Sequence, residues 1–295
     1  MTGYSTHKVK SAPFLVKVTH SKRRGHFTMP VQHYHEHYEI YYLLNGERNY
    51  FIQDRIYAIK KGDIVLIYKN VVHRTIDSSI PDHERLLVDF TDEALNAVSS
   101  KERALLLQAF DMNSPVIRLE PYEQIMVEHL LNKMLQEEQA KAPGYNICLR
   151  AYLLELLVLL VRLRGQKRKS LAETIEASDP LHQKISEIVQ YINGHYSQEL
   201  SLTTLSKTFY ISPYYLSRLF KRVTGFNFVE YLNLIRVKEA QKLLQGTDMK
   251  IIEVAQRVGF GSVAHFGRTF KSITSLSPSD YRKTFKSTRE PATEG

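Results

Sequence analysis

A cluster of histidine and acidic residues near the N-terminus is the first part of the sequence that could do chemistry. The segment from His33 to Glu39 reads HYHEHYE. In an extended strand, alternation places four polar side chains on one face, namely His33, His35, Glu39 and Tyr41. Imidazole and carboxylate groups of this kind can hold zinc, manganese, nickel or iron. They can equally hydrogen-bond a small polar effector, or form a buried network in which the groups satisfy one another.

Short β-rich segments surround this cluster and predict the sheet that positions it. They are Phe14–Val18, Tyr38–Leu44, Arg48–Ile52, Ile56–Ile59, Ile64–Tyr68 and Leu86–Phe90. Turn signals separate them at Asn45-Gly46, Gln53-Asp54 and Lys61-Gly62-Asp63. The Asn-Gly pair predicts a hairpin, because both residues tolerate a positive φ angle. Many short strands at regular spacing predict a small barrel or sandwich.

The next part of the chain has a helical pattern. Helices are predicted at Asp92–Gln108, Tyr122–Gln139 and Asn146–Arg164, the second of them after Pro121. The third is apolar on two faces, with Leu149, Leu153, Leu156, Leu160 and Leu163 on one and Leu154, Leu157, Val158 and Val161 on the other. Such a helix can pack on its own domain and on a second copy of the chain, or it can be buried within one copy. We assign Leu153, Leu156 and Leu160 to a dimer interface.

Composition and charge restrict the class of protein. The chain has 295 residues, a formal charge of +9 and one cysteine, Cys148, which excludes an intramolecular disulfide and a cysteine-based zinc finger. The N-terminus lacks the apolar core of a signal peptide, and the apolar run 151–161 is shorter than the ~20 residues of a membrane-spanning helix. We therefore expect a cytoplasmic protein with no membrane partner. Basic residues exceed acidic ones by 2 in residues 1–180 and by 7 in residues 181–295, so the C-terminal part is predicted to bind a polyanion.

The C-terminal part repeats itself at an interval of 50 residues. The matched pairs are Ser212 and Ser262, Arg218 and Arg268, Phe220 and Phe270, Lys221 and Lys271, Thr224 and Thr274, and Tyr231 and Tyr281. A repeat of this length indicates one supersecondary unit used twice. Each unit is predicted as helix, tight turn, helix, with a serine N-cap on the second helix and Gly259 supplying a positive φ in the second turn. This is the helix-turn-helix pattern, whose second helix enters the DNA major groove.

The outward face of the second helix in the first unit carries the predicted DNA contacts. These are Tyr214, Tyr215, Ser217, Arg218, Lys221 and Arg222. Arginine can read guanine, and both lysine and arginine can neutralise phosphate. A long helix at about 228–245, closed by Gly246, joins the two units. At 1.5 Å per residue it is about 27 Å long, so one chain could reach two successive major grooves about 34 Å apart.

Several C-terminal segments resemble the AraC/XylS family of bacterial transcription regulators. They are 214–221 (YYLSRLFK), 251–260 (IIEVAQRVGF), 266–271 (FGRTFK) and 277–282 (SPSDYR), within a resemblance that covers about residues 181–286. The resemblance implies base contacts by Tyr214, Ser217 and Arg218 in the first unit and by Val263, Ala264, Gly267 and Arg268 in the second, where Lys271 is the counterpart of Lys221. Ser275 stands where a glycine commonly ends the last helix, and Tyr210 lies in the first turn. The base specificity of the second helix stays open, because only Arg268 is an obvious hydrogen-bond donor.

The N-terminal histidines resemble the cupin family. His33, His35, Glu39 and Gly46 have the spacing of its first motif, and Gly62, His73 and Asp77 have that of its second, although Tyr68, Asn70 and Asp77 replace the usual Pro, Gly and Asn. The segment is similar to the effector-binding cupin of sugar-responsive AraC-type regulators. In cupin enzymes the positions of His33, His35, Glu39 and His73 bind metal. The degraded second motif and the regulator family favour a polar effector pocket without metal, formed by His33, His35, Glu39, Tyr41 and His73.

Together these features predict an α+β multidomain chain. Residues 1–165 are expected to form a cupin-like β-barrel with a following helical segment, 166–180 a linker, and 181–295 an all-α DNA-binding domain with two helix-turn-helix units joined by a long helix. We expect a transcription regulator, not an enzyme and with no cofactor, that binds double-stranded DNA and a small molecule such as a sugar. We expect it to be a homodimer and to contact RNA polymerase if it activates transcription. The alternative is a metal-dependent cupin enzyme fused to DNA-binding helices.

Overall fold

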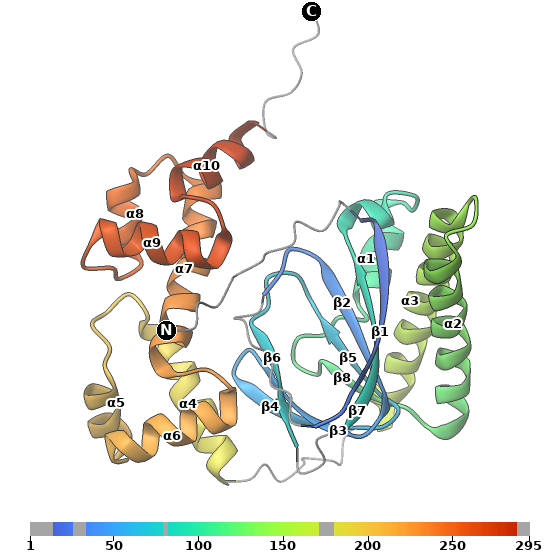
Figure 1. The fold of residues 1–295 in the computed structure, drawn as a ribbon, viewed down its shortest axis with the longest axis horizontal. Helices are drawn as coiled ribbons and strands as arrows, with labels where there is room; N and C mark the ends of the chain where they lie inside the picture. Colours follow the sequence, from blue (N-terminus) through green and yellow to red (C-terminus); the bar gives the residue numbers. More distant parts are fainter. Residues whose placement is uncertain (1–13, 26–33, 79–81, 171–179, 288–295) are drawn as a thin grey trace, which may run out of the picture.

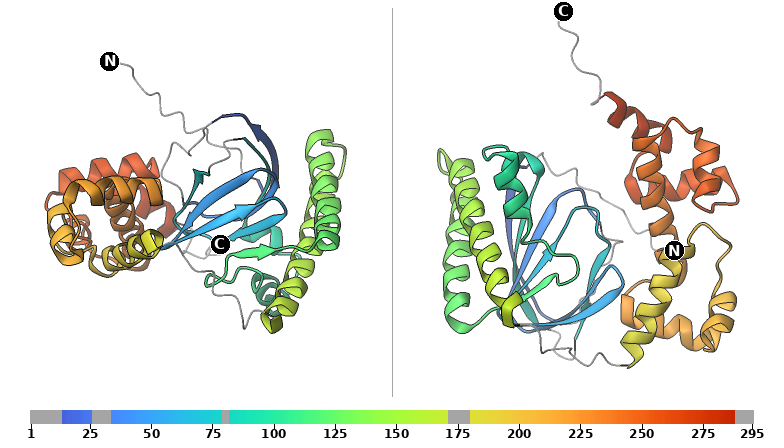
Figure 2. Two further views of the ribbon diagram at one scale, coloured as in Figure 1. Left: turned by 90° about the horizontal axis from the view of Figure 1, so that it is seen from below. Right: turned by 180° about the vertical axis from the view of Figure 1, so that it is seen from behind.

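The computed structural model describes residues 14–25, 34–78, 82–170 and 180–287. Figure 1 shows two β-sheets facing each other, a helical hairpin on the outer side of one sheet and a group of helices beside the other. The two further views in Figure 2 show the same order of layers. The expected architecture, an N-terminal β-rich domain followed by an all-α domain, is confirmed.

Eight strands form the two sheets, and every pair of neighbouring strands is antiparallel. The strands are β1 (Val16–Arg23), β2 (Tyr38–Asn45), β3 (Glu47–Ile52), β4 (Arg55–Lys60), β5 (Asp63–Ile67), β6 (His73–Asp77), β7 (His83–Phe90) and β8 (Val116–Arg118). The larger sheet has the order β1-β7-β2-β5-β8 and the smaller one the order β4-β3-β6. The two sheets together enclose the interior of the barrel.

Alternation along the strands separates two environments. In β2, Ile40 and Tyr42 pack into the core beneath the helical hairpin, whereas Tyr41 and Leu43 pack into the core between the sheets. Because side chains alternate in direction, Glu39 shares the interior face with Tyr41. The alternation of side chains along β2 therefore places a polar residue, Glu39, inside the barrel.

The turn at Asn45-Gly46 does not close a hairpin, so that prediction is wrong. Gly46 has the expected positive φ of +90°, but β2 pairs with β5 and β7, whereas β3 pairs with β4 and β6. The chain crosses here from one sheet to the other. A Cβ atom at Gly46 would lie 2.3 Å from the carbonyl oxygen of Asp82, so close packing also requires glycine. The Gln53-Asp54 turn does close a hairpin, between β3 and β4.

Three features of this domain were not predicted from the sequence. Strand β6 has the polar sequence HRTID and β8 has three residues, so neither gives the apolar run that marks a strand. The helix predicted at Asp92–Gln108 is divided into a 3-10 turn, η1 (Asp92–Leu95), and a helix, α1 (Ser100–Leu107). Ser99 starts α1 afresh, because its hydroxyl accepts from the N–H of Glu102, whose carboxylate in turn accepts from the N–H of Ser99.

Helices α2 (Pro121–Ala140) and α3 (Tyr145–Ser170) form the hairpin that covers the larger sheet. Its main leucine stripe is fully buried in the core of this domain, including Leu153, Leu156 and Leu160 at 0% exposure. The assignment of these three residues to a dimer interface is therefore wrong, because the barrel covers them. Helix α3 continues to Ser170, into the segment assigned to the linker, and the domain limits stay a prediction. Among the described residues, no helix has the length and apolar character needed to cross a membrane.

The C-terminal domain contains the duplicated unit. Its helices are α4 (Pro180–His195), α5 (Leu202–Phe209), α6 (Pro213–Thr224), α7 (Phe228–Gly246), α8 (Ile251–Arg257), α9 (Val263–Thr274) and α10 (Pro278–Ser287). Ser212 and Ser262 are the predicted N-caps, accepting from the N–H groups of Tyr215 and His265. Gly246 was predicted to be the first residue after the long helix, but it is the last helical residue, and the cap is the extended Thr247.

Candidate functional sites

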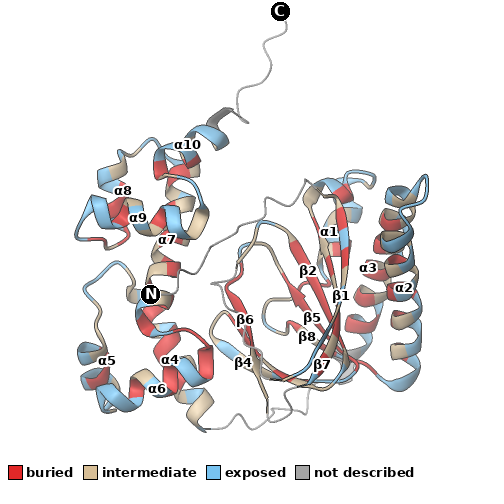
Figure 3. Cartoon of the chain, in the orientation of Figure 1, coloured by how far each residue is buried: buried red, intermediate tan, exposed pale blue. Residues whose placement is uncertain are grey.

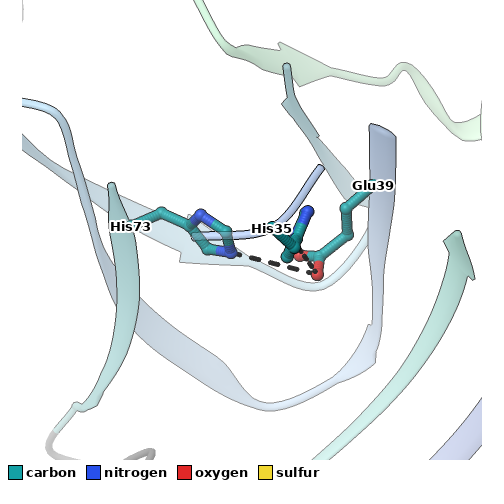
Figure 4. A group of neighbouring side chains, drawn as sticks. All are labelled: His35, Glu39 and His73. Carbon is teal, nitrogen blue, oxygen red and sulfur yellow. Dashed lines mark ion pairs between the residues drawn. The ribbon is translucent and has the colours of Figure 1, made fainter. Parts of the chain in front are cut away.

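Three of the predicted site residues meet inside the barrel. His35 lies just before β2, Glu39 lies on β2, and His73 is the first residue of β6 on the opposite sheet. Figure 4 shows both imidazoles directed at the Glu39 carboxylate. His35 Nε2 lies 3.4 Å and His73 Nε2 lies 4.0 Å from Glu39 Oε2. Two sheets thus contribute to one site.

Backbone contacts fix the direction of both imidazole rings. The Nδ1 atom of His35 lies 2.9 Å from the carbonyl oxygen of His37, and the Nδ1 atom of His73 lies 2.8 Å from the carbonyl oxygen of Val71. Each carbonyl accepts a hydrogen from Nδ1, so each Nε2 atom faces the carboxylate. The ring of His35 is further held by stacking on His37, at a centroid distance of 3.7 Å.

Other polar groups complete the site, and sequence reasoning missed them. Tyr50 on β3 is fully buried and donates its hydroxyl hydrogen to Glu39 Oε1 at 2.9 Å. Asp89 on β7 is the direct cross-strand neighbour of Glu39 and lies 3.6 Å from His37 Nε2. Arg85 on β7 lies over the ring of Tyr41 at 5.5 Å. The alternation of β3 and β7 could have indicated these residues, but only once the strand register was known.

Burial shifts the pKa values of these groups. Burial lowers the pKa of His35, but the hydrogen bond and charge of Glu39, together with Asp89, outweigh it and hold the pKa above its ordinary value. Burial, helped by the charge of Glu39, raises the pKa of Asp89 to about 7. Burial raises the pKa of Tyr41 to about 12 and that of Tyr50 well above its ordinary value. The tyrosines are therefore neutral and able to donate hydrogen bonds at physiological pH.

The arrangement can hold two kinds of ligand. The candidate ligand atoms of His35, Glu39 and His73 all lie within 4.8 Å of one another, which two imidazoles and a carboxylate require in order to share a metal ion. The same groups, with the nearby tyrosine hydroxyls, can donate and accept hydrogen bonds from a hydroxylated small molecule. Tyr41 is on the interior face but is not part of the three-residue cluster, and His33 lies outside the described residues.

The first helix-turn-helix unit, α5 and α6, exposes the side chains predicted to contact DNA. Tyr214 is 73% and Tyr215 is 47% exposed, and Arg218, Lys221 and Arg222 are exposed, whereas Ser217 is partly buried. Figure 3 shows exposed residues at the start of α6, on the side of the domain away from the barrel. The guanidinium of Arg218 lies over the Tyr214 ring at 5.6 Å. This contact holds two polar groups side by side on one surface.

The second unit, α8 and α9, has the same framework with smaller side chains. Val263 is 40% exposed, Ala264, Arg268 and Lys271 are also exposed, and Gly267 is partly buried. The turns of the two units differ by one residue. Ser206 and Ala255 accept the same closing hydrogen bond, from Ile211 and Phe260, 49 residues apart, whereas the N-caps are 50 residues apart. The second turn therefore has one residue more.

The smaller sheet packs against the first helix-turn-helix unit. Phe51 and Val72 share a core with Ile188 and Phe226 of the helical domain. The Arg74 guanidinium lies 4.8 Å from the centre of the Phe226 ring. Hydrogen bonds add to this contact, from the Tyr231 hydroxyl to the Gln53 carbonyl oxygen at 3.1 Å and from Gln190 to Asp54 at 2.8 Å. The barrel and the DNA-binding domain thus share a packed interface.

Comparison with protein families finds two matching models. The model of the AraC-like ligand binding domain matches residues 18–157, and that of a helix-turn-helix domain matches residues 205–284. The first range contains the site around Glu39, and the second contains both α6 and α9.

Individual relatives cover the chain to different extents. The uncharacterized HTH-type transcriptional regulator YijO of Escherichia coli is 36% identical over 46% of this chain, and the chain spans about half, 49%, of its length. The HTH-type transcriptional activator RhaS of an Enterobacter species is 26% identical over 85% of this chain and 87% of that protein. Among solved structures, the C-terminal domain of AraT, a response regulator from Geobacillus stearothermophilus, is 34% identical over 40% of this chain and 94% of that one, with a TM-score of 0.35.

Proposed function

The chain belongs to the AraC family of transcription regulators, and from this premise we propose that it couples the binding of a small polar molecule in its barrel to sequence-specific DNA binding. The protein acts in the cytoplasm and its effector is a sugar or a related hydroxylated metabolite. The observation that carries the proposal is the meeting of His35, Glu39 and His73 between the two sheets of a chain whose other domain exposes two recognition helices. A hydroxyl-rich ligand suits these groups, because each sugar hydroxyl can both donate and accept a hydrogen bond.

The test is a thermal-shift screen of sugars and small metabolites on the full chain. A ligand that binds only the folded state raises the melting temperature, and the rise grows with its concentration. Glu39→Gln should abolish the rise for the ligand found. Arg222→Ala, an exposed residue on α6, is the matched control and should leave it unchanged. A ligand that stabilises the wild type and the Glu39→Gln variant equally would place the binding site elsewhere.

A metal ion is a second candidate occupant, favoured by the 4.8 Å grouping of ligand atoms. His35, Glu39 and His73 would hold the ion, and a metal with open positions could act as a Lewis acid, as a metal-dependent cupin enzyme requires. We expect no tightly bound metal, because the relatives reported above are named as transcriptional regulators. Elemental analysis of the purified protein checks this. One equivalent of transition metal, lost when His33 and His35 are changed to Ala, would favour the enzyme.

We also propose that the protein is a homodimer that uses the outer face of α2 and α3. At the start of α2, Tyr122, Ile125 and Met126 are each 45–69% exposed. Between the helices lies a hollow of about 440 Å³, lined largely by apolar side chains that include Leu154 and Val158. Exposed apolar groups gathered in this way mark an interaction surface.

The charges on this face fit a second copy of the same chain. Glu155 and Arg162 both line the hollow, one on each side of Val158 and Leu159. If two α3 helices pair in antiparallel fashion about a two-fold axis at residues 158–159, Glu155 of each copy faces Arg162 of the other. Sedimentation tests this arrangement. Glu155→Arg and Arg162→Glu should each weaken the dimer, and the double variant should restore it.

Leu154→Glu with Val158→Glu should also abolish the dimer, because two carboxylates would then be buried at its centre. The same change at Ala104 and Leu105, two exposed apolar residues of α1, is the matched control. A wild-type chain that sediments as a monomer would remove the proposal, and dimers that survive both sets of changes would place the interface elsewhere.

A further inference from the structure

One residue of the first helix-turn-helix unit has a conformation and an exposure that folding does not explain. Tyr210, which ends α5, has a φ of 55° and a ψ of 44°, in the left-handed region. Its side chain is 96% exposed. A residue with a Cβ atom is strained in this conformation, and an exposed ring recovers little through packing.

The second unit solves the same geometric problem with glycine. Gly259 has a φ of +91° and occupies the equivalent place, since the next residue closes the helix in each unit: Ile211 donates to Ser206 and Phe260 to Ala255. Tyr210 therefore occupies the position that is a glycine, Gly259, in the second unit. Its Cβ atom strains the turn, and its phenol ring, at 96% exposure, makes almost no contact within the chain.

We propose that Tyr210 is a DNA contact, donating its hydroxyl hydrogen to a backbone phosphate beside the major groove that α6 enters. Tyr210 comes two residues before the N-cap of α6, and Tyr214 and Tyr215 are exposed on the first turn of that helix. In a helix-turn-helix the recognition helix meets the base edges with its N-terminal residues while the first helix crosses the DNA backbone. Tyr210 caps that first helix, next to the recognition helix, so it lies where phosphates are within reach. Tyrosine is among the side chains that donate to phosphate oxygens.

The test uses the full chain and a duplex of random sequence, because a phosphate contact is independent of base sequence. Tyr210→Gly should raise the melting temperature by about 2–4 °C, since strain is released, and weaken binding about three- to tenfold, since one hydrogen bond is lost. Tyr210→Phe should lose the same affinity without the gain in stability. The salt dependence of binding should be unchanged, because the phenol carries no charge.

Ser275 provides the matched control. It ends α9 with a φ of 67°, is exposed, and stands where the first unit has Gly225. Ser275→Gly should raise the melting temperature in the same way and leave DNA affinity unchanged. Full affinity in either Tyr210 variant would overturn the proposal. A wild-type chain that binds no DNA would instead remove the proposed function itself.

A second inference rests on different contacts, those between the barrel and the helical domain. The site residues alternate with residues that touch the two helix-turn-helix units. His73 faces Glu39, whereas Val72 and Arg74 on either side pack on the first unit. His35 also faces Glu39, whereas its neighbours Tyr34 and Glu36 contact the C-terminal half of the helical domain, on α7 and α10.

The two segments reach different units. Arg74 lies over Phe226, which follows α6 in the first unit. The Tyr34 hydroxyl donates to Gln241 in the second half of α7, and the Tyr281 hydroxyl on α10 lies 3.5 Å from Glu36. Tyr281 belongs to the core of the second unit. Through these contacts the barrel holds both units at once.

We infer that the site around Glu39 sets the relative orientation of the two helix-turn-helix units, with β6 acting on the first and residues 34–36 on the second. This inference rests on the proposed function, in which a ligand occupies the site. A change in the spacing of His35 and His73 must move their chain neighbours, because adjacent residues share the backbone. The spacing of the two recognition helices decides whether both can enter successive major grooves.

The experiment measures the distance between spin labels on the two units in the full chain. The labels are attached to Lys207→Cys on α5 and Gln256→Cys on α8, two exposed positions, in a Cys148→Ser background. Glu39→Gln removes the charge that both imidazoles face, and Tyr50→Phe removes one hydrogen bond to the same carboxylate. Each should shift or broaden the distance distribution by several ångströms. The release variant is Arg74→Ala combined with Tyr34→Phe, which removes one of the described contacts to each half of the helical domain.

The outcomes distinguish this inference from the proposed function. A distribution in Glu39→Gln and Tyr50→Phe identical to that of the wild type, with the release variant changed, would overturn the inference. An unchanged distribution in the release variant would also overturn the inference, because the contacts of Arg74 and Tyr34 would then not determine the distance between the two units. The thermal-shift screen on the wild-type chain independently tests whether the site binds an effector.

Discussion

The site inside the barrel and the outward faces of α6 and α9 are both made of polar side chains, yet their surroundings differ. Glu39 and His73 are 4% and 0% exposed, and Arg48, which shares the interior face of β3 with Tyr50, is 1% exposed. Arg218 and Lys221 lie in water. Polar groups in the barrel are therefore part of the folded core, whereas those on the recognition helices are free to meet a partner. Substitutions should affect stability in the first region and DNA affinity in the second.

The largest expected effect is on the ion pair between the buried Arg48 and the partly buried Asp77. Arg48→Ala should lower the free energy of unfolding by about 2–3 kcal/mol, because the buried guanidinium is lost and Asp77, whose side chain is 19% exposed, keeps its charge without this partner. Arg222→Ala, at an exposed position, should change it by no more than about 0.5 kcal/mol. Urea denaturation of both variants measures the difference. Equal losses of unfolding free energy in the two variants would contradict the expected difference between the barrel and the recognition helices.

The pH dependence of stability should come from the barrel. The pKa of Asp89 is raised to about 7, so the folded state holds a proton that the unfolded state has already lost above its ordinary value near 4. Stability should therefore fall as pH rises from 5 to 7, by about 2–3 kcal/mol, and level off above. The raised pKa of His35 acts in the same direction, because its stabilising charge is lost as pH rises.

Asp89→Asn should remove most of this slope and make the protein more stable than the wild type at pH 8. Urea denaturation at pH 5, 7 and 8 checks this. Glu84→Gln is the surface control, because the pKa of Glu84 is lowered by its hydrogen bonds to His20 and Lys22 and the group titrates below this range. If the stability of the wild type instead rises between pH 5 and 7, the pKa of Asp89 is not raised in the folded protein.

On the DNA-binding side, Arg218→Ala and Arg268→Ala should leave stability unchanged and lower affinity for the specific site. If both arginines contact base edges, each change costs about 1–3 kcal/mol of binding free energy. Each should relax base preference in one half of an asymmetric site of about two DNA turns. Selection of binding sites from a random library tests this. A uniform loss without altered preference in Arg268→Ala would make the second unit an anchor rather than a reader.

The smallest expected effects concern phosphate contacts. Lys221→Ala and Lys271→Ala should weaken binding to all sequences alike and reduce the slope of log affinity against log salt by about one. Titrations at several salt concentrations on specific and random duplexes measure both quantities. A change in base preference in either variant would show that the lysine contacts base edges and not phosphates.

The sequence alone determined most of the helical domain. The 50-residue repeat and the serine caps at Ser212 and Ser262 were predicted and are found. These features depend on hydrogen bonds between residues three or four apart and on the 3.6-residue period of one helix. The local sequence therefore contains the information. The exposed face of α6 was also predictable, because the apolar residues of this helix mark its buried face and the basic residues lie on the opposite one.

Tertiary structure alone decided how the barrel is assembled. The pairing of β2 with β5 and β7, the crossing at Gly46 and the polar strand β6 depend on partners far along the chain, which alternation within a strand does not identify. The same pairing brought Tyr50 and Asp89 to the side of Glu39. It also decided which face of α3 is buried: the sequence showed two apolar faces, and only packing against the larger sheet determined that Leu153, Leu156 and Leu160 face inward.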